Sequence, residues 1–183
     1  MKNVIHTFCF LFSATVLFAQ GRILWDESVN GRLATSYTTP TSFGNLATGT
    51  NSILGSVEAV PFEFGWIGTN DYFTFQLPDG FQMESASLQI NQQILVWLGT
   101  ANFDNQIGYQ VTGTSEELLP YFGGQPLTSG GYSMYLSDQY LQNDPTSVNY
   151  RFDFVVSAVP EPGTWALLAL GSALFWSFAR RRP

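Results

Sequence analysis

The stretch Tyr72-Phe73-Thr74-Phe75-Gln76-Leu77 decides the fold, because apolar and polar residues alternate along it with a period of two. A strand presents successive side chains to opposite faces, so Phe73, Phe75 and Leu77 are predicted to face a core. Pro78-Asp79-Gly80 follows and predicts a turn, since proline sets φ and glycine accepts positive φ. This pattern is typical of a strand with one buried face and one solvated face.

Similar runs recur along the chain between Gly, Pro, Asn and Asp residues. The predicted strands are Ile23–Trp25, Ser52–Val57, Phe62–Trp66, Ser85–Asn91, Ile94–Leu98, Ile107–Val111, Tyr132–Leu136 and Asn149–Ser157. Ile94–Leu98 is apolar throughout, so we expect a central strand with Trp97 in the core. Only residues 114–119 predict a helical turn, which Pro120 would end. The pattern as a whole predicts an all-β fold, an antiparallel sandwich or barrel.

The composition of residues 20–158 narrows the chemistry. This segment holds thirteen carboxylates against Arg22, Arg32 and Arg151, a net charge near −10, which argues against nucleic acid as a partner. It has no lysine, histidine or cysteine. Ser-His-Asp and Cys-His catalysis, Schiff bases and His- or Cys-ligated zinc are therefore excluded. A pair of carboxylates and a calcium site remain open.

Calcium is the one cofactor that these residues leave open. Asp71 beside Asn70, and Asp104 within Asn102-Phe103-Asp104-Asn105, place oxygen ligands in segments read as loops. Asp and Asn also form turns by bonding their own backbone, and we favour this explanation. No twelve-residue calcium loop is present.

Glycan contact is the second candidate chemistry. Aromatic faces stack on sugars, and Trp66 and Tyr135 are the best candidates because their neighbours predict an outward or loop position. The competing explanation is that these rings fill the core. A catalytic carboxylate pair would have to come from Glu58 with Glu63, or from Glu116 with Glu117, and nothing in the sequence sets their separation.

The first 19 residues predict a secretory signal peptide. Lys2 gives a small positive start, and residues 4–18 are largely apolar. Cleavage is expected after Ala19, with Gly21 as the second choice and an uncleaved anchor as the alternative. Cys9 lies inside this apolar run and should leave with the signal.

The C-terminal segment, residues 159–183, predicts a sorting signal. Val159-Pro160-Glu161-Pro162 should be extended and accessible, because prolines exclude a helix there. The uncharged run 163–179 would span roughly 25 Å as a helix, slightly less than a bilayer core. Arg180, Arg181 and Arg182 would stop it and stay cytoplasmic, with the body outside. A permanent anchor is the alternative.

Val159-Pro160-Glu161-Pro162-Gly163-Thr164, the apolar run and the arginine cluster together resemble the PEP-CTERM sorting signal of exopolysaccharide-producing Gram-negative bacteria. The resemblance implies that an exosortase-type membrane protease recognises Pro160-Glu161-Pro162. It also implies export, transient anchoring in the inner membrane, and delivery to the cell surface or extracellular matrix. It implies a destination rather than an activity.

The body resembles a second family. Residues 46–57, 70–80, 126–133 and 150–154 are similar to segments of bacterial pre-peptidase C-terminal-like domains. The resemblance implies a noncatalytic, jelly-roll-like β-sandwich. The sequence therefore predicts an exported noncatalytic protein, associated with exopolysaccharide or biofilm, rather than an enzyme. The alternative is a small secreted carbohydrate-active enzyme that uses a carboxylate pair.

Overall fold

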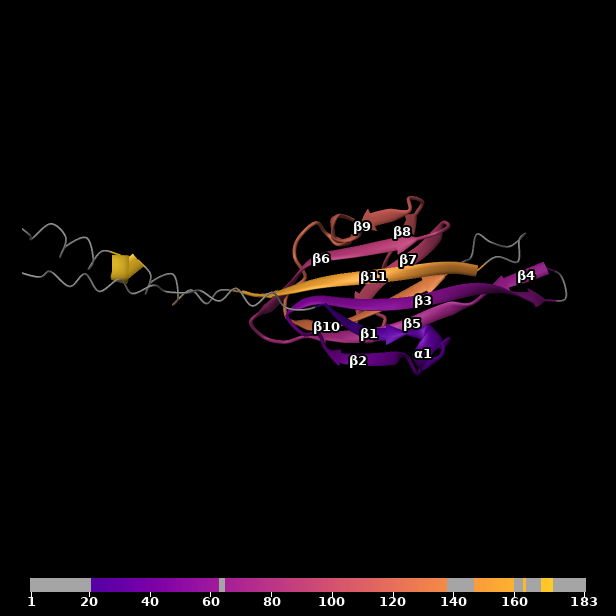
Figure 1. Cartoon of the computed structure of the whole chain (residues 1–183), viewed down its shortest axis with the longest axis horizontal. Helices are drawn as coiled ribbons and strands as arrows, with labels where there is room; N and C mark the ends of the chain where they lie inside the picture. The colour runs from indigo at the N-terminus through magenta and orange to yellow at the C-terminus, as the bar shows by residue number, and fades with distance from the viewer. Residues whose placement is uncertain (1–20, 63–64, 138–146, 160–162, 164–168, 173–183) are drawn as a thin grey trace, which may run out of the picture.

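The chain forms two packed β-sheets, as the computed structural model shows (Figure 1). The structure describes residues 21–62, 65–137, 147–159, 163 and 169–172. Between residues 21 and 159, every named element of the described part is a strand except one short α-helix and one 3₁₀ turn, and residues 169–172 are helical. The predicted all-β sandwich is confirmed.

The first sheet has the strand order β1-β3-β11-β6-β9, and β4 pairs with the far end of β3. Its strands are β1 (Arg22–Asp26), β3 (Gly49–Phe62), β4 (Gly65–Gly68), β6 (Phe81–Ile90), β9 (Ser115–Glu117) and β11 (Ser147–Ala158). A four-residue helix, α1 (Glu27–Asn30), follows β1 directly, with Asp26 capping it by accepting from the Ser28 N–H at 2.9 Å.

The second sheet has the order β2-β5-β10-β7-β8. Its strands are β2 (Thr41–Asn45), β5 (Asn70–Leu77), β10 (Gly130–Ser137), β7 (Ile94–Thr100) and β8 (Ile107–Val111). A 3₁₀ turn, η1 (Leu119–Phe122), connects β9 to the segment that leads into β10. In β5 the residues Phe73, Phe75 and Leu77 are buried, as their alternation predicts.

The core lies between the sheets and centres on β5 and β11. Phe73 and Phe75 from β5 meet Phe152 and Phe154 from β11, with centroids 5.7 Å apart for Phe73–Phe152 and 5.2 Å for Phe75–Phe154. All four are essentially inaccessible to solvent. One strand from each sheet therefore supplies the aromatic centre of the sandwich.

Two edge pairings differ from the antiparallel expectation. β1 runs parallel to β3, and β2 runs parallel to β5, each at an edge of its own sheet. Parallel neighbours need a crossover rather than a tight hairpin. Here the chain leaves β1 through α1, adds β2 to the second sheet, and only then returns to the first sheet as β3.

Two local predictions are wrong. Phe62–Trp66 is not one strand, because the chain reverses there and Phe62 pairs with Gly65. Residues 114–119 are not a helical turn, because Ser115–Glu117 adds to the edge of β6 as β9. The Glu117 carboxylate accepts from the Ala86 N–H at 2.8 Å and so fixes this edge, while Pro120 opens η1 instead of ending a helix.

β1 begins and β11 ends at the same end of the sandwich (Figure 1), where Arg22 pairs with Asn51 and Val156 with Gly49. Just beyond β11, the Val159 N–H donates to the Gly80 carbonyl at 2.7 Å. The predicted signal peptide (1–19), Pro160-Glu161-Pro162 and the arginines at 180–182 lie outside the described residues, as does most of the expected helix 163–179. In the described part of the chain, no helix combines the length and apolarity needed to cross a membrane.

Candidate functional site

Three aromatic side chains line up on the outer face of the second sheet. Tyr135 of β10 pairs in register with Tyr72 of β5 on one side and with Trp97 of β7 on the other. Alternation places all three opposite the buried faces of their strands. We call Tyr72, Tyr135 and Trp97 the aromatic row.

The rings of the row stack on one another. The Trp97 and Tyr135 centroids are 4.3 Å apart with planes 5° from parallel, and those of Tyr135 and Tyr72 are 5.1 Å apart at 26°. Parallel rings this close can only lie face to face. Both faces of Tyr135 are therefore covered, and only its edge and hydroxyl are open to solvent.

Trp97 is not in the core, contrary to the expectation from its apolar strand. It is half-buried on the outer face, and its indole lies across Gly108 of β8, where an added Cβ would come within 2.7 Å of the indole Cδ1. Gly108 is the register partner of Trp97, so the glycine leaves room for the indole. The outer face thus contains large rings that the inter-sheet core does not require.

The row continues at its Tyr72 end. Tyr72 meets Phe103 at 5.5 Å and 73°, and Tyr37 at 6.4 Å and 62°. Burial raises the pKa of Tyr72. The pKa of Tyr135 is raised to about 12, mainly by burial and further by the nearby Tyr72. Both hydroxyls are therefore neutral donors and acceptors at any physiological pH.

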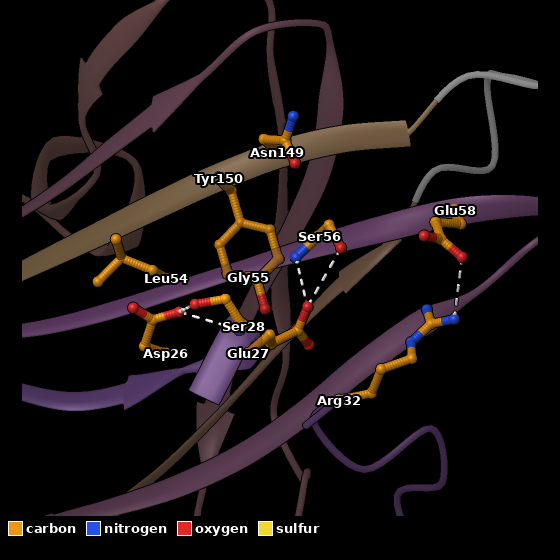
Figure 2. Close-up of a pocket in the computed structure, with 10 residues that line it drawn as sticks. All are labelled: Asp26, Glu27, Ser28, Arg32, Leu54, Gly55, Ser56, Glu58, Asn149 and Tyr150. Carbon is orange, nitrogen blue, oxygen red and sulfur yellow. Dashed lines mark hydrogen bonds and ion pairs between the residues drawn. The ribbon is translucent and has the colours of Figure 1, made fainter. Parts of the chain in front are cut away.

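A hollow of about 450 Å³ lies elsewhere, where α1 meets β3 and β11 (Figure 2). Most of the charged side chains that line this hollow already hold hydrogen bonds or ion pairs within the protein. The Glu27 carboxylate accepts from the Ser56 N–H at 2.7 Å and from the Leu33 N–H at 2.9 Å. Arg32 pairs with Glu58 at 3.3 Å, between partly exposed side chains. These contacts fasten the helix and the following segment to β3, which is a structural use of the carboxylates.

Asp71 and Tyr150 form a hydrogen bond between the two sheets behind this hollow. The Tyr150 hydroxyl of β11 donates to Asp71 Oδ2 of β5 at 2.8 Å, while Oδ1 is buried without a partner among the described residues. Burial first, and then the Glu27 carboxylate, raise the pKa of Asp71 to about 7. Burial also raises the pKa of Tyr150 well above its usual value. Gly55 makes room for the Tyr150 ring, because a Cβ there would lie 2.6 Å from its Cζ.

The calcium candidates do not lie in one place. Asp71 is in a strand and points into the core, not into a loop as expected, whereas Asp104 is exposed in the loop between β7 and β8. Over the residues that the structure describes, no cluster of three or more acidic, His or Cys side chains is suited to a metal ion. Calcium binding stays a prediction without a site that unites the two aspartates.

The remaining candidates are also separated. Glu116 and Glu117 are successive residues of β9, so their side chains leave on opposite faces; Glu116 accepts from the Gly113 N–H at 2.9 Å and Glu117 from Ala86. Glu63 lies outside the described residues, so its pairing with Glu58 is not placed. Trp66 is in β4, opposite Pro61, and its side chain is outside the described part.

Sequence reasoning reached Tyr135 but missed its partners. Alternation along β5 places Tyr72 opposite Phe73 and so on the outer face, yet the register that joins β5, β10 and β7 is a long-range property. For Asp71 a signal was available, because it stands two residues before Phe73 and so on the same, buried face.

Comparison with known proteins identifies the C-terminal segment. Residues 158–182 match the PEP-CTERM protein-sorting motif. No curated protein matches the chain in sequence. Among solved structures, the chain is similar to PliG of Salmonella Typhimurium, a periplasmic inhibitor of g-type lysozyme, at 13% identity. That likeness has a TM-score of 0.35 over 63% of this chain and 99% of the other, a level that bears on neither fold nor function.

The motif and the fold define the class of protein: an exported β-sandwich that is sorted at a membrane. More particularly, it carries a PEP-CTERM motif, which implies processing by an exosortase, a membrane protein. The motif begins at the last residue of β11, Ala158, so the sorting segment follows the sandwich without a linker.

Proposed function

We propose that this protein is a noncatalytic component of the cell surface or extracellular matrix that binds extracellular polysaccharide through the outer face of its second sheet. The observation that carries the proposal is the aromatic row. Tyr72, Tyr135 and Trp97 stand on the solvent side of the sheet, where they add nothing to the core between the sheets. Aromatic rings with polar tips are suited to contacts that are partly apolar and partly wet, as sugars require.

Two further features support a binding protein over the carbohydrate-active enzyme. The carboxylates of Glu27, Glu116 and Glu117 accept hydrogen bonds from backbone N–H groups and so hold the fold together. Asp71 has a raised pKa but is fully buried and does not line the hollow of Figure 2. A catalytic acid must reach the bond that it protonates.

The sorting function predicts that replacing Pro160, Glu161 and Pro162 by alanine blocks processing. Alanine does not impose the extended geometry that proline favours, so we expect the protease no longer to recognise the segment. We expect the variant to keep its C-terminal segment and to stay with the membrane fraction, as measured by intact mass and cell fractionation. Replacing Thr38, Thr39 and Pro40 by alanine is the control and should leave processing unchanged. Unchanged mass and location in the first variant would instead establish a permanent anchor.

Polysaccharide binding predicts that the full chain is retained by exopolysaccharide from the producing bacterium, and that Tyr72→Ala with Trp97→Ala reduces retention at least tenfold. Tyr72 and Trp97 each offer a polar tip, and one hydrogen bond is worth about 0.5–1.5 kcal/mol net, so losing both accounts for a tenfold change, which is about 1.4 kcal/mol. Tyr121→Ala is the matched control, since Tyr121 is an exposed ring stacked on Tyr109, outside the row. Circular dichroism would verify that each variant folds. Retention that survives the double substitution would exclude the row as the binding site.

Several finer expectations belong to this proposal and stay predictions. They are cleavage of residues 1–19, the transient membrane helix at 163–179, the jelly-roll-like arrangement implied by the pre-peptidase resemblance, and delivery to the surface of a Gram-negative cell.

A further inference from the structure

A small pocket at the Tyr72 end of the aromatic row is walled mainly by rings. Its lining is Tyr37, Tyr72, Phe103, Gln106 and Tyr135, and its volume is about 190 Å³. Tyr72 stands steeply to both Phe103 (73°) and Tyr37 (62°), so the rings enclose the space from different directions. Pockets for drug-sized ligands begin at about 300 Å³, so this one fits a single small group rather than a whole oligomer.

The loop that supplies Phe103 is built to hold it there. Phe103 has φ 59°, a left-handed value that bulky residues seldom adopt, and Asn105 has φ 50°, which asparagine adopts more readily. The loop is pinned by the Phe103 N–H donating to the Thr100 carbonyl at 2.9 Å and the Thr100 N–H to the Asp104 carbonyl at 3.0 Å. Strained residues of this kind cluster at ligand-binding sites in proteins. The conformation of Phe103 agrees with such a site and fixes its ring in the wall of the pocket.

The charge around the pocket favours a cation. None of the described residues that line it is basic, and Asp104, next to Phe103, is an exposed carboxylate. Of the three arginines in residues 20–158, Arg32 pairs with Glu58 and Arg151 pairs with Asp153. All three lie in the first sheet or in the segment just after α1. Aromatic faces carry negative charge density, and Tyr37, Phe103 and the side of Tyr72 turned away from Tyr135 can supply them, while Tyr135 adds its hydroxyl oxygen as an acceptor. Several rings around a small volume are the arrangement that binds organic ammonium groups.

We propose that this pocket binds the ammonium group of an amino sugar in the polysaccharide. That the ligand is part of a polysaccharide rests on the proposed function. The preference for an ammonium group rests on the pocket alone. A body near −10 repels acidic polymers and attracts cationic ones, which agrees with an amine-bearing chain. The pocket then anchors one substituent while the aromatic row contacts the sugar rings.

The experiment separates charge from shape. Choline and its uncharged isostere 3,3-dimethylbutanol are titrated into the full chain and followed by NMR shifts of the Gln106 side-chain amide and the Phe103 backbone amide. We expect saturable shifts with the cation and at least tenfold weaker binding of the isostere. Glucosamine oligomers should likewise bind at least tenfold more tightly than N-acetylglucosamine oligomers of equal length.

Variants test the location. Tyr37→Ala and Phe103→Ala should each weaken cation binding at least fivefold, Tyr37→Phe should retain it because the ring remains, and Tyr121→Ala should have no effect. Tyr37 is 63% exposed, so its loss leaves the fold intact. Equal binding of cation and isostere, or full binding by both alanine variants, would overturn the ammonium site.

The same measurements distinguish this inference from the proposed function. Retention on exopolysaccharide with no ammonium preference would overturn this inference alone. Cation binding without retention would overturn the polysaccharide function and leave the pocket's specificity standing. Binding to phosphocholine vesicles but not to glucosamine oligomers would overturn the amino-sugar source.

Discussion

Asp71→Asn is expected to stabilise the chain at pH 8 and to leave its stability nearly unchanged at pH 4. Below its ordinary pKa of 3.8 the Asp71 carboxyl is protonated in both the folded and the unfolded chain. Between that value and about 7 only the folded chain keeps the proton, so the free energy of unfolding falls as the pH rises. At about 1.4 kcal/mol per pH unit, the loss over this window is on the order of 4 kcal/mol. Asparagine carries no charge and removes this loss.

The free energy of unfolding is measured by urea unfolding of the full chain at pH 4, 6 and 8. The value for the unmodified protein is subtracted from that of the variant at each pH, so that the contributions of the other carboxylates cancel. The amide of the Asp71→Asn variant would still offer an oxygen to the Tyr150 hydroxyl, so the contact between the sheets is retained. Asp79→Asn, in the exposed turn after β5, is the control for losing one negative charge. A stability difference for Asp71→Asn that does not grow between pH 4 and 8 would contradict the raised pKa.

The strands of the sandwich core could be predicted because their chemistry is local. Each of β5, β6 and β11 alternates between buried apolar and outward polar residues, and the period of two shows both the strand and its buried face. Where alternation fails, the prediction fails too. Ile94–Leu98 is apolar on both faces, so nothing local shows that Trp97 lies outside, over Gly108.

The candidate site was predictable only in part, because it depends on register. Tyr72, Trp97 and Tyr135 come from strands that are far apart in the chain and meet through pairings that no short pattern encodes. The edge strand β9 also depends on distant contacts. Residues 114–119 satisfy the local rules for a helical turn, but the pairing with β6 and the contact of Glu117 with Ala86 make Ser115–Glu117 a strand. Phe103 adds a left-handed backbone conformation that its residue type does not suggest.

Phe73→Ala is expected to cause the largest loss of stability in the chain, about 3–5 kcal/mol in the free energy of unfolding. Phe73 is fully buried and its ring contacts Phe43 of β2 at 5.6 Å and Phe152 of β11 at 5.7 Å, so one side chain joins an edge strand and both sheets. Truncation leaves a cavity that these neighbours can fill only in part. Urea unfolding measures the loss, and Phe73→Leu, which keeps most of the volume, should lose less.

The size of this effect follows from what holds the sandwich together. Residues 20–158 contain no cysteine, so no disulfide restrains the unfolded chain and burial between the sheets must supply the stability. A domain of this length is stable by only about 5–15 kcal/mol, so Phe73→Ala removes a large share of the total. Tyr37→Ala deletes an aromatic ring of similar size from an exposed position and should change stability by no more than about 0.5 kcal/mol. If the two alanine variants lost the same stability, the phenylalanine cluster of β5 and β11 would not be the centre of the fold. A large loss confined to Phe73→Ala would locate the stabilising burial between the sheets and leave the outer aromatic face free for binding.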